Sequence, residues 1–469
     1  MQQVKKETAY RTERDGLGEM RIEKDALYGI HSARARDNFP VSMRGMDHDF
    51  IKNIALIKKA AALLNGRTGS LPAEKAEAIA FACDEIMAGR YFDAFIVDAM
   101  QGGAGTSANM NANEVIANIA IKRLGGEYGD YSVIHPIDHV NMYQSTNDVI
   151  PSAGRLTAIE KCSRFLEKLD VLHAALREKE AEFDDILKVG RTQLQDAVPM
   201  RVGQGYGAYA AMIERSKAQI ESAMECLGSI NLGATAIGTA INVVRPYYDG
   251  IVPAVSELFG RELRRSENLF DGTQNADDFA TVSSAVKVCA IKLSKMASDL
   301  RLLSSGPNSG LCEIQLPAKQ SGSSIMPGKV NPVLPEALNQ AAFLVMGHDV
   351  TITQAVEAGQ LELNAFLPVV LFQLFEEIEI LGNAVATFTE NCLRGIVINL
   401  NECEDDINRC WSIATALNPS IGYDRSTAIV KKAQKSKKSI FDIARKESGL
   451  SEEELERLLD PHSLTEMND

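Results

Sequence analysis

The sequence predicts an all-α protein built around several long helices, and three observations support this. Apolar residues recur at steps of three and four along several long stretches of the chain. Aromatic residues make up only 6% of the 469, so the cores must be built from Ala, Leu, Ile, Val and Met, a mixture that favours helices. No alternation of strand and helix patterns appears, which argues against a parallel α/β sheet.

The first half of the chain opens with an irregular region and continues with two helical ones. Residues 1–45 mix charges, glycines and short apolar pieces, so we expect irregular structure or a small hairpin there. Helical periodicity begins near Phe50 and ends at Gly66, with Lys58 just ahead of an Ala-rich run. The stretch 152–187 contains no proline and predicts one amphipathic helix of about 30 residues, roughly 45 Å long.

The second half repeats this pattern. Residues 203–226 are helical in pattern but rich in Gly and Ala, which permit close helix–helix contact, and 275–304 is a further amphipathic stretch. Residues 361–399 continue the pattern, and Pro368 is expected to kink that helix. Helices of this length pack side by side, and an apolar stripe left over on each would drive oligomerisation.

Length and composition also indicate the domain organisation. About 150 residues per domain suggests about three domains. We place them at 1–145, an N-terminal domain, 146–398, the long-helix bundle, and 399–469, a small helical C-terminal unit with a charged tail.

Charge and targeting features exclude several classes of function. The net charge of −14 opposes binding to nucleic acid or anionic lipid. The sequence shows no secretory signal and no apolar run long enough to cross a membrane. Its eight cysteines are scattered, without CxxC pairs or Cys/His clusters, so we expect reduced, buried thiols in a cytoplasmic protein rather than disulfides or a zinc site.

Two polar segments interrupt the helical pattern before residue 150. Residues 101–113, QGGAGTSANMNAN, combine glycines with the hydroxyl and amide groups of Thr106, Ser107 and Asn109, but on their own they read more simply as a turn capping a helix at 113–119. In residues 144–148, QSTND, the last four residues are all suited to begin a helix, and a helix N-terminus also binds carboxylates. Both interpretations of this second segment stay open.

Two further polar segments follow. Residues 190–199, GRTQLQDAVP, form a polar insertion that on its own could serve only to fix a turn. Residues 321–332, SGSSIMPGKVNP, are no Walker loop, because five residues separate Gly322 from Gly328 and Val330 follows Lys329. Their composition instead fits a mobile anion-binding loop in which a lysine and an asparagine hold a carboxylate while a serine reaches the reacting carbon.

Taken together, the four segments resemble the conserved regions of one family. The run GSSIMPGKVNP resembles the signature loop of the aspartase/fumarase superfamily, and GAGTSANMNANEV, HPIDHVNMYQSTND and GRTQLQDAVPM stand at that family's order and spacing. The resemblance spans essentially the whole chain. It implies an all-α, three-domain subunit whose central domain gives five long helices to the twenty-helix core of a homotetramer, with each active site built from three subunits.

The resemblance also implies the reaction, an anti elimination that yields fumarate from a small dicarboxylate. Ser323 would be the base that removes the Cβ proton. The resemblance gives the other site residues two roles. The groups that would stabilise the aci-carboxylate dianion are Thr106, Ser145, Thr146 and Ser324, and those that would hold the α-carboxylate are Thr192, Lys329 and Asn331. A serine is a weak base, so loop closure and a local field that favours its alkoxide are required.

The leaving group follows from Gln193. Fumarases of the family typically carry His after GRT, whereas GRTQ resembles many aspartases, as does NANEV at 111–115. Asn147 and Gln193 can accept hydrogen bonds from a substrate ammonium, so the resemblance implies elimination of ammonia from L-aspartate. His31 and Arg34 match positions near the site in the aspartase branch, although they also fit surface polar residues.

Departures from the family pattern leave alternatives open. Ile137 replaces the usual Asn of a secondary anion site, and Tyr143 replaces a small Ser, which could narrow the pocket. The alternatives are a fumarase or a related lyase on another malate- or aspartate-like substrate, and a non-catalytic relative, which the intact signature loop disfavours. Some aspartases are stimulated by divalent cations, but no Asp/Glu/His cluster here asks for one, so we expect no essential cofactor. The basic run at 431–438 fits a solvated helix face.

Overall fold

A computed structural model describes residues 9–467 of the chain. Its contacts group the chain into two compact units. The first unit comprises Met1–Leu166, Ala218–Val288 and Leu344–Ile380, and the second comprises Glu167–Lys217, Cys289–Phe343 and Leu381–Asp469. The domain boundaries expected after residues 145 and 398 stay a prediction.

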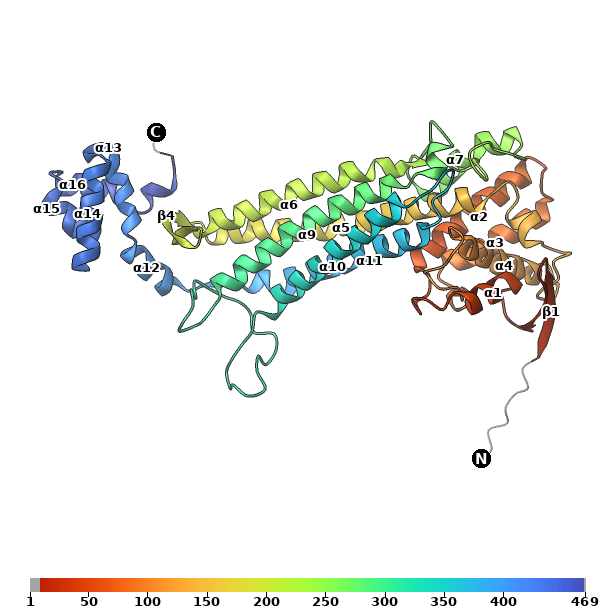
Figure 1. The fold of residues 1–469 in the computed structure, drawn as a ribbon, viewed down its shortest axis with the longest axis horizontal. Helices are drawn as coiled ribbons and strands as arrows, with labels where there is room; N and C mark the ends of the chain where they lie inside the picture. Colours follow the sequence, from red (N-terminus) through yellow and green to blue (C-terminus); the bar gives the residue numbers. More distant parts are fainter. Residues whose placement is uncertain (1–8, 468–469) are drawn as a thin grey trace, which may run out of the picture. The chain divides into compact units, whose positions relative to one another are not determined.

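Five long helices run through the sequence from residue 146 to 391, and each begins in one unit and ends in the other. They are α5 (Thr146–Glu182), α6 (Val202–Met224), α9 (Asp277–Leu303), α10 (Val333–Glu357) and α11 (Leu367–Asn391). Within each unit, segments of these helices lie side by side (Figure 1). Ser283 Oγ of α9 donates to Asp349 Oδ1 of α10 at 3.2 Å in the first unit, and Asn339 Nδ2 of α10 donates to Ser294 Oγ of α9 at 2.9 Å in the second. The predicted all-α fold is confirmed.

The helix ends differ in places from those expected. The helices expected at 203–226 and 275–304 are present with ends shifted by a few residues at most. The helix expected at 361–399 is shorter, and Pro368 is its second residue rather than a kink, because the first turn of a helix needs no N–H from that position. The sequence did not single out α10.

The longest helix, α5, begins six residues before the expected start and ends at Glu182 rather than at 187. It includes Pro151, which has no N–H to donate to the carbonyl of Asn147 one turn earlier. Asn231 Nδ2 donates to that carbonyl oxygen instead, at 3.0 Å. A side chain from elsewhere in the first unit thus replaces the missing backbone bond, and the helix continues through the proline.

Small residues allow the close helix contacts predicted for α6. A Cβ on Gly203 would lie 3.0 Å from Asp184 Cα, and one on Gly207 would lie 2.7 Å from the carboxyl carbon of Glu180. Both neighbours belong to the end of α5 and the segment after it, within the second unit. A larger residue at Gly203 would push the backbones apart, whereas one at Gly207 would displace the Glu180 side chain.

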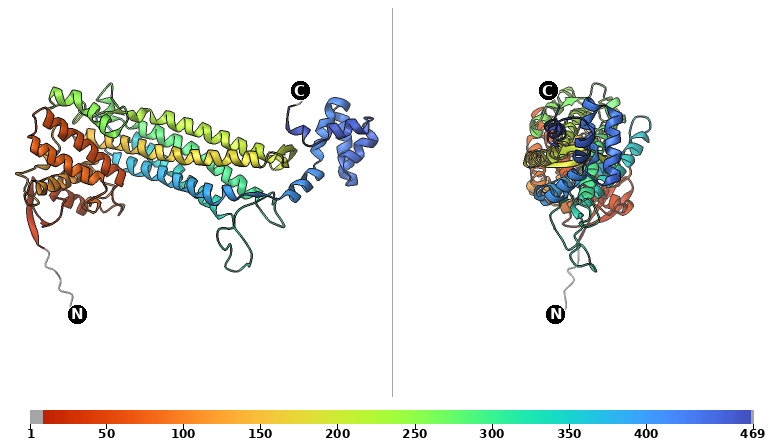
Figure 2. Two further views of the ribbon diagram at one scale, coloured as in Figure 1. Left: turned by 180° about the vertical axis from the view of Figure 1, so that it is seen from behind. Right: turned by 90° about the vertical axis from the view of Figure 1, so that its left-hand side faces the viewer.

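The first unit contains the remaining N-terminal elements. α2 packs on α3, α4 and α7, and α2, α3 and α4 lie side by side in Figures 1 and 2. α2 confirms the helix expected near Phe50, buries Ile54 and Ile57 completely, and begins where Asp47 Oδ1 accepts the N–H groups of Asp49 and Phe50. The expected hairpin is the antiparallel pair β1–β2. The elements are β1 (Tyr10–Asp15), β2 (Gly18–Glu23), α1 (Ile30–Asn38), α2 (His48–Arg67), α3 (Ala73–Met87), η1 (Phe92–Ala94), α4 (Thr106–Arg123), η2 (Pro136–Val140), η3 (Cys226–Gly228), β5 (Ser229–Ile230), α7 (Arg245–Phe259), β6 (Arg264–Arg265) and α8 (Asp271–Gln274).

The second unit ends in the small helical part expected after Asn399. Its helices enclose an apolar cluster that includes Leu417, Ile429, Ile440 and Leu455. The unit also contains a hairpin of two longer strands and a pair of two-residue strands. The elements are β3 (Leu187–Thr192), β4 (Gln195–Arg201), β7 (Ile314–Gln315), η4 (Leu393–Gly395), β8 (Val397–Ile398), α12 (Leu400–Arg409), η5 (Trp411–Leu417), α13 (Asn418–Ile421), α14 (Tyr423–Ser436), α15 (Ile440–Glu447), α16 (Glu452–Leu458) and η6 (Ser463–Thr465).

Candidate active site

The glycine-rich segment leads directly into α4. Ala104 and Gly105 both have positive φ, at 54° and 92°, and the helix then begins at Thr106, seven residues before the start expected from the sequence. A Cβ on Gly105 would lie 2.9 Å from Ile150 Cγ2 of α5, so this close approach needs glycine. Thr106 is exposed, and its Oγ1 donates to the carbonyl of Gly103 at 2.8 Å.

A cluster of asparagines joins the first turns of α4 to the start of α5. Asn109 Nδ2 lies 3.2 Å from both Asn141 Oδ1 and Thr146 Oγ1, and Asn113 Nδ2 donates to the same Asn141 oxygen at 3.3 Å. All four residues belong to the first unit. The structure thus connects the glycine-rich segment with the QSTND segment, two regions that the sequence analysis singled out separately.

The half-buried QSTND segment begins a helix and also offers polar groups for a ligand, so its two interpretations are compatible. Ser145 Oγ accepts the N–H of Asn147 at 3.2 Å, while Asp148 Oδ1 accepts the N–H of Ser145 at 2.9 Å. These bonds use the Ser145 oxygen as an acceptor, so its O–H can donate to a carboxylate. Asn147 Nδ2 donates to the carbonyl of Ala236 at 2.7 Å, which directs the amide and leaves Oδ1 to accept from an ammonium.

Beneath this segment lies a buried pair of charges that the sequence analysis missed. Asp148 is fully buried, and its Oδ2 accepts the N–H groups of Gly233 at 3.2 Å and Thr235 at 3.1 Å. Burial raises the pKa of Asp148 to about 6, and the backbone hydrogen bond from Ser145 opposes the rise. Lys58 of α2 is also fully buried, and burial lowers its pKa to about 7 against the attraction of Asp148. A lysine at a core position of a helix is the sequence signal for this pair.

The GRTQ segment forms the tip of a hairpin in the second unit. Thr192 pairs with Gln195, and the two residues between them, Gln193 and Leu194, have φ of 54° and 62°. Positive φ at both positions is the geometry of a tight hairpin turn whose twist matches that of the strands. Thr192 and Gln193 are exposed at this tip. Arg191, immediately before this tip, forms ion pairs with Glu313 and, at 3.0 Å, with Asp406.

The signature segment, residues 321–332, is an irregular loop whose two ends meet, with Gly322 on one side and residues 329–331 on the other. We call this closed end the neck of the loop. Asn331 Nδ2 donates to the carbonyl of Gly322 at 2.5 Å. A Cβ on Gly322 would lie 2.6 Å from the carbonyl carbon of Lys329 and 2.7 Å from Val330 Cα, so glycine is required where the two ends of the loop meet. The loop tip carries apolar side chains into solvent, with Ile325 83% exposed.

Within this loop the geometry around Ser323 favours an anionic oxygen. Ser323 Oγ accepts the N–H of Met326 at 2.9 Å and that of Ile325 at 3.2 Å. Two donors aimed at one hydroxyl oxygen stabilise its alkoxide more than its neutral form. Within residues 9–467, no carboxylate lies within ion-pair distance of Lys329 Nζ, so this cation is open to a bound anion.

The predicted site residues therefore fall into three groups. Thr106, Ser145, Thr146 and Asn147 gather at the starts of α4 and α5 in the first unit. In the second unit, Thr192 and Gln193 occupy the hairpin tip, while Ser323, Ser324, Lys329 and Asn331 occupy the signature loop. Among the described residues, no hydrogen bond or ion pair joins the hairpin pair to the loop residues.

Four other residues noted in the sequence, His31, Arg34, Ile137 and Tyr143, contact other residues of the first unit. Arg34 is paired with Asp15 at 2.7 Å, and the backbone N–H of His31 donates to Glu114 at 2.8 Å. Tyr143 has a φ of 61°, and its ring packs against that of Tyr247, with centroids 5.4 Å apart. Ile137 lies in the η2 turn, where its N–H donates to His135 Nδ1 at 3.2 Å.

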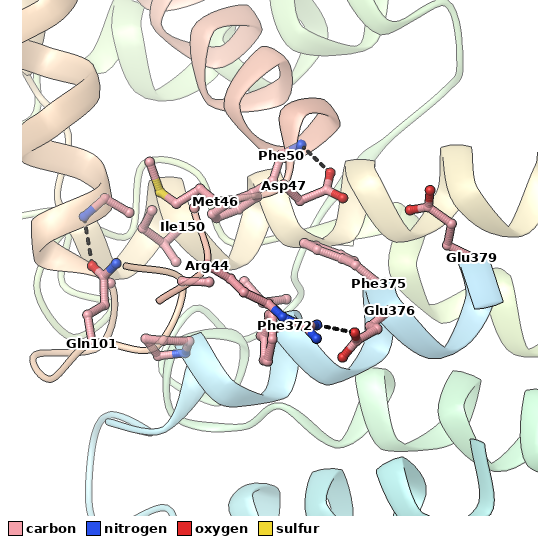
Figure 3. A pocket seen from close by; sticks show the side chains of 16 residues that line it. Arg44, Met46, Asp47, Phe50, Gln101, Ile150, Phe372, Phe375, Glu376 and Glu379 are labelled. Atoms are coloured by element: carbon pink, nitrogen blue, oxygen red, sulfur yellow. Dashed lines mark hydrogen bonds and ion pairs between the residues drawn. The ribbon is translucent and has the colours of Figure 1, made fainter. Parts of the chain in front are cut away.

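A pocket of about 200 Å³ in the first unit lies beside the glycine-rich segment but contains none of the predicted residues (Figure 3). Phe50 and Phe375 give it an apolar wall. Its charged groups are paired, Arg44 with Glu376 and Asp47 with Lys161 at 2.8 Å. Because these groups already have partners, the pocket offers little to a dicarboxylate.

Residues 9–467 lack three features: a cluster of metal ligands, a disulfide bond and a membrane-spanning helix. No group of three His, Cys, Asp or Glu side chains there could hold a metal ion, and all eight cysteines are free. None of the helices in this part of the chain combines the length and the apolar character needed to cross a bilayer.

Comparison with known proteins identifies the family. A family model described as "Lyase" matches residues 18–347, and one described as "Fumarase C C-terminus" matches residues 413–466. An aspartate ammonia-lyase of a Bacillus species is 46% identical, and the alignment covers 98% of both chains. The structure of a fumarate lyase:delta crystallin from Brucella melitensis bound to cobalt superposes with a TM-score of 0.95 at 45% identity, covering 98% of this chain and 100% of that one. The recombinant class II fumarase of Schistosoma mansoni gives a TM-score of 0.94 at 32% identity, covering 97% and 99%. The chain is therefore a lyase and belongs to the aspartase/fumarase superfamily.

Proposed function

We propose that the chain is an aspartate ammonia-lyase, which eliminates ammonia reversibly from L-aspartate to give fumarate. The observation that carries the proposal is the near-complete match to aspartate ammonia-lyases at 46% and 45% identity, the latter from Bacillus subtilis strain 168 with 97% of this chain and 96% of that one aligned. Gln193 at the hairpin tip, where fumarases of the family typically have His, supports an amine rather than a hydroxyl as the leaving group.

The chemical step requires removal of a weakly acidic Cβ proton. The Ser323 alkoxide takes this proton, the electron pair of the C–H bond moves onto the β-carboxylate to give the aci-carboxylate dianion, and the Cα–N bond then breaks to release ammonia. The N–H groups of Ile325 and Met326 support the assignment of Ser323, because they stabilise the alkoxide before the substrate arrives.

The other residues divide between the two ends of the substrate. Four hydroxyl groups stabilise the dianion: Thr106 at the start of α4, the half-buried Ser145 and Thr146 at the start of α5, and Ser324 of the signature loop. The Thr106 hydroxyl turns from the Gly103 carbonyl to the substrate when it takes this role. Lys329, Asn331 and Thr192 hold the α-carboxylate and fix the substrate for anti elimination. Asn147 and Gln193 accept hydrogen bonds from the ammonium group.

We also propose that the active enzyme is a homotetramer with sites shared between subunits. Two sets of exposed apolar side chains support an assembly: those at the tip of the signature loop, and Phe343, Leu344 and Val350 of α10, of which Phe343 and Val350 are each 60% exposed. Exposed large apolar side chains of this kind are characteristic of subunit interfaces. In this arrangement Ser323 of one subunit acts on a substrate held by Thr146 and its neighbours in another.

The proposed function also has consequences for the cofactor, the cellular location and the partners of the protein. The reaction uses no essential cofactor, since serine chemistry and hydrogen-bond donors suffice for it. The eight free cysteines support a cytoplasmic location. We propose two kinds of partner: the small dicarboxylate substrate, and the other subunits of the homotetramer.

A paired substrate assay tests the function. Fumarate formation is followed by ultraviolet absorbance with L-aspartate and with L-malate, and the proposal predicts turnover of L-aspartate only. Turnover of L-malate but not L-aspartate would favour fumarate hydratase, the activity of the class II fumarase that shares the fold. Ser323→Ala is expected to lower kcat by about 100- to 10,000-fold, the range for loss of a general base, with Ser321→Ala as the control in the same loop.

Subunit mixing tests the shared sites. Ser323→Ala and Thr146→Val are each expected to be nearly inactive, whereas tetramers reassembled from an equal mixture should recover about one quarter of wild-type activity, because one site in four receives both intact residues. If each site came from a single chain, the mixture would stay inactive.

A further inference from the structure

Lys58 is buried in a place where a lysine is costly. It lies in α2 with 0% of its surface exposed, on the same side as the buried residues Ile54 and Ala61. Fully buried lysines are rare, because the ammonium loses its hydration and must regain partners inside the protein. The function of this residue should therefore be sought in those partners.

Its hydrogen-bond partner lies at the centre of the asparagine cluster. Lys58 Nζ donates to Asn141 Oδ1 at 2.7 Å, which is the shortest of the three hydrogen bonds this oxygen accepts. Asn141 Nδ2 in turn donates to the carbonyl of Gln144 at 3.1 Å. Asn141 therefore connects the ammonium to the backbone immediately before Ser145 and, through Asn109, to the hydroxyl of Thr146.

The second partner is electrostatic. Asp148 attracts the ammonium, and its two oxygens accept backbone N–H groups of Ser145, Gly233 and Thr235. Within residues 9–467, two further titratable groups interact electrostatically with this pair: the Cys83 thiol of α3 with Lys58, and the Tyr247 hydroxyl of α7 with Asp148. Neither brings a positive charge, so Lys58 supplies the counter-charge of the carboxylate.

We infer that Lys58 is a positioning residue: its buried ammonium, through its hydrogen bond to Asn141, holds the turn at 144–148 so that Ser145, Thr146 and Asn147 face the substrate. The inference rests on the proposed function of those three residues. Without the ammonium, Asn141 would lose its strongest donor and Asp148 would be left as an uncompensated buried charge. Both losses act on the backbone that carries the substrate-binding groups.

The predicted consequence is a defect in catalysis larger than that in binding. The dianion donors act mainly in the transition state, and a displacement of about 1 Å can lower a rate about 100-fold. Lys58→Met is therefore expected to lower kcat for L-aspartate by about 10- to 100-fold, with KM changed less than about threefold. Lys59→Met is the matched control, because Lys59 is next in α2 but is partly exposed, with its ammonium paired to Asp84 at 2.6 Å.

A second readout does not depend on activity. Amide hydrogen exchange in the assembled protein, read by mass spectrometry on peptides covering 141–150, should be about tenfold faster in Lys58→Met than in wild type or Lys59→Met, while peptides from α14 should be unchanged. If the wild type did not turn over L-aspartate, the proposed function would fail, but this measurement would still test how the turn is held.

The outcomes separate the alternatives. Wild-type kcat together with wild-type exchange in Lys58→Met would overturn the inference. A lower melting temperature with unchanged kcat would also overturn it, because it would assign Lys58 to stability alone. If Lys58→Met does not assemble, Lys58→Gln, which keeps a donor but no charge, takes its place under the same criteria. Failure of both to assemble would make Lys58 a folding residue and contradict the inference.

Discussion

The neck of the signature loop gives the sharpest single prediction. Gly322 lies where the loop closes, and a Cβ there would stand 2.6 Å from the carbonyl carbon of Lys329 and 2.7 Å from Val330 Cα. Carbon atoms prefer separations of about 3.5–4.0 Å, so Gly322→Ala must open the neck by about 1 Å. The atoms in the way belong to the backbone, so no side-chain rotation can relieve the contact.

Opening the neck should disturb catalysis more than folding. It would break the hydrogen bond from Asn331 Nδ2 to the Gly322 carbonyl and shift Ser323, which follows directly. A shift of about 1 Å predicts a fall in kcat of about 100-fold for fumarate formation from L-aspartate. The melting temperature should change by less than about 2 °C, because no residue of the loop belongs to the apolar core of the chain.

Another glycine in the loop provides the control. Gly328 has a φ of 79° but nothing within 4 Å of its Cβ position. Gly328→Ala therefore adds only left-handed backbone strain of about 1–2 kcal/mol, without a steric collision. We expect it to retain much more activity than Gly322→Ala. Equal activity of Gly322→Ala and wild type would refute the argument from the neck.

Three further predictions concern stability and metals. Gly154→Ala should lower the free energy of unfolding by about 1–3 kcal/mol in denaturant titrations, because its Cβ would lie 2.6 Å from Leu371 Cδ2 in a packed interface; an unchanged midpoint would contradict this. Burial raises the pKa of Asp98, but hydrogen bonds from Ser42, Met43 and Met100 outweigh burial and hold this pKa below its ordinary value. These bonds therefore stabilise the fold at neutral pH, and the stabilisation is lost as the pH falls through the folded pKa. Asp98→Asn should therefore melt lower than wild type at pH 7, and the gap should narrow below about pH 4; a gap independent of pH would refute the assignment. Dialysis against EDTA should leave kcat within about twofold, and a loss restored by a divalent cation would contradict a metal-free mechanism.

The sequence was sufficient to predict the helices that have one buried and one exposed face. The pattern at 275–304 gave α9 almost to the residue. α10 was not predicted, because Phe343, Leu344 and Val350 make its exposed face apolar too and weaken the contrast between faces. The early start of α5 could not be foreseen, because it depends on Asn231 replacing the hydrogen bond that Pro151 cannot make.

The site was predictable where it lies in short, distinctive segments. The hydroxyl and amide groups of QSTND and of the signature loop stand close together in the sequence and could be named from it. The contacts that hold them could not, because Lys58 and Asn141 are 83 residues apart and meet only in the folded chain. A charged residue within a stripe of buried apolar positions, such as Lys58, is the one local sign of such a contact.

The central claim is that Ser323 exchanges a proton with the Cβ of the substrate. The reverse reaction tests it directly: fumarate and ammonia are incubated in deuterium oxide, and the product is examined by proton NMR. Wild type should form L-aspartate with one deuterium at a single Cβ position, as anti addition requires, while Ser323→Ala should bind fumarate but form no deuterated aspartate. Deuterated aspartate formed by Ser323→Ala at the wild-type rate would show that another group transfers the proton.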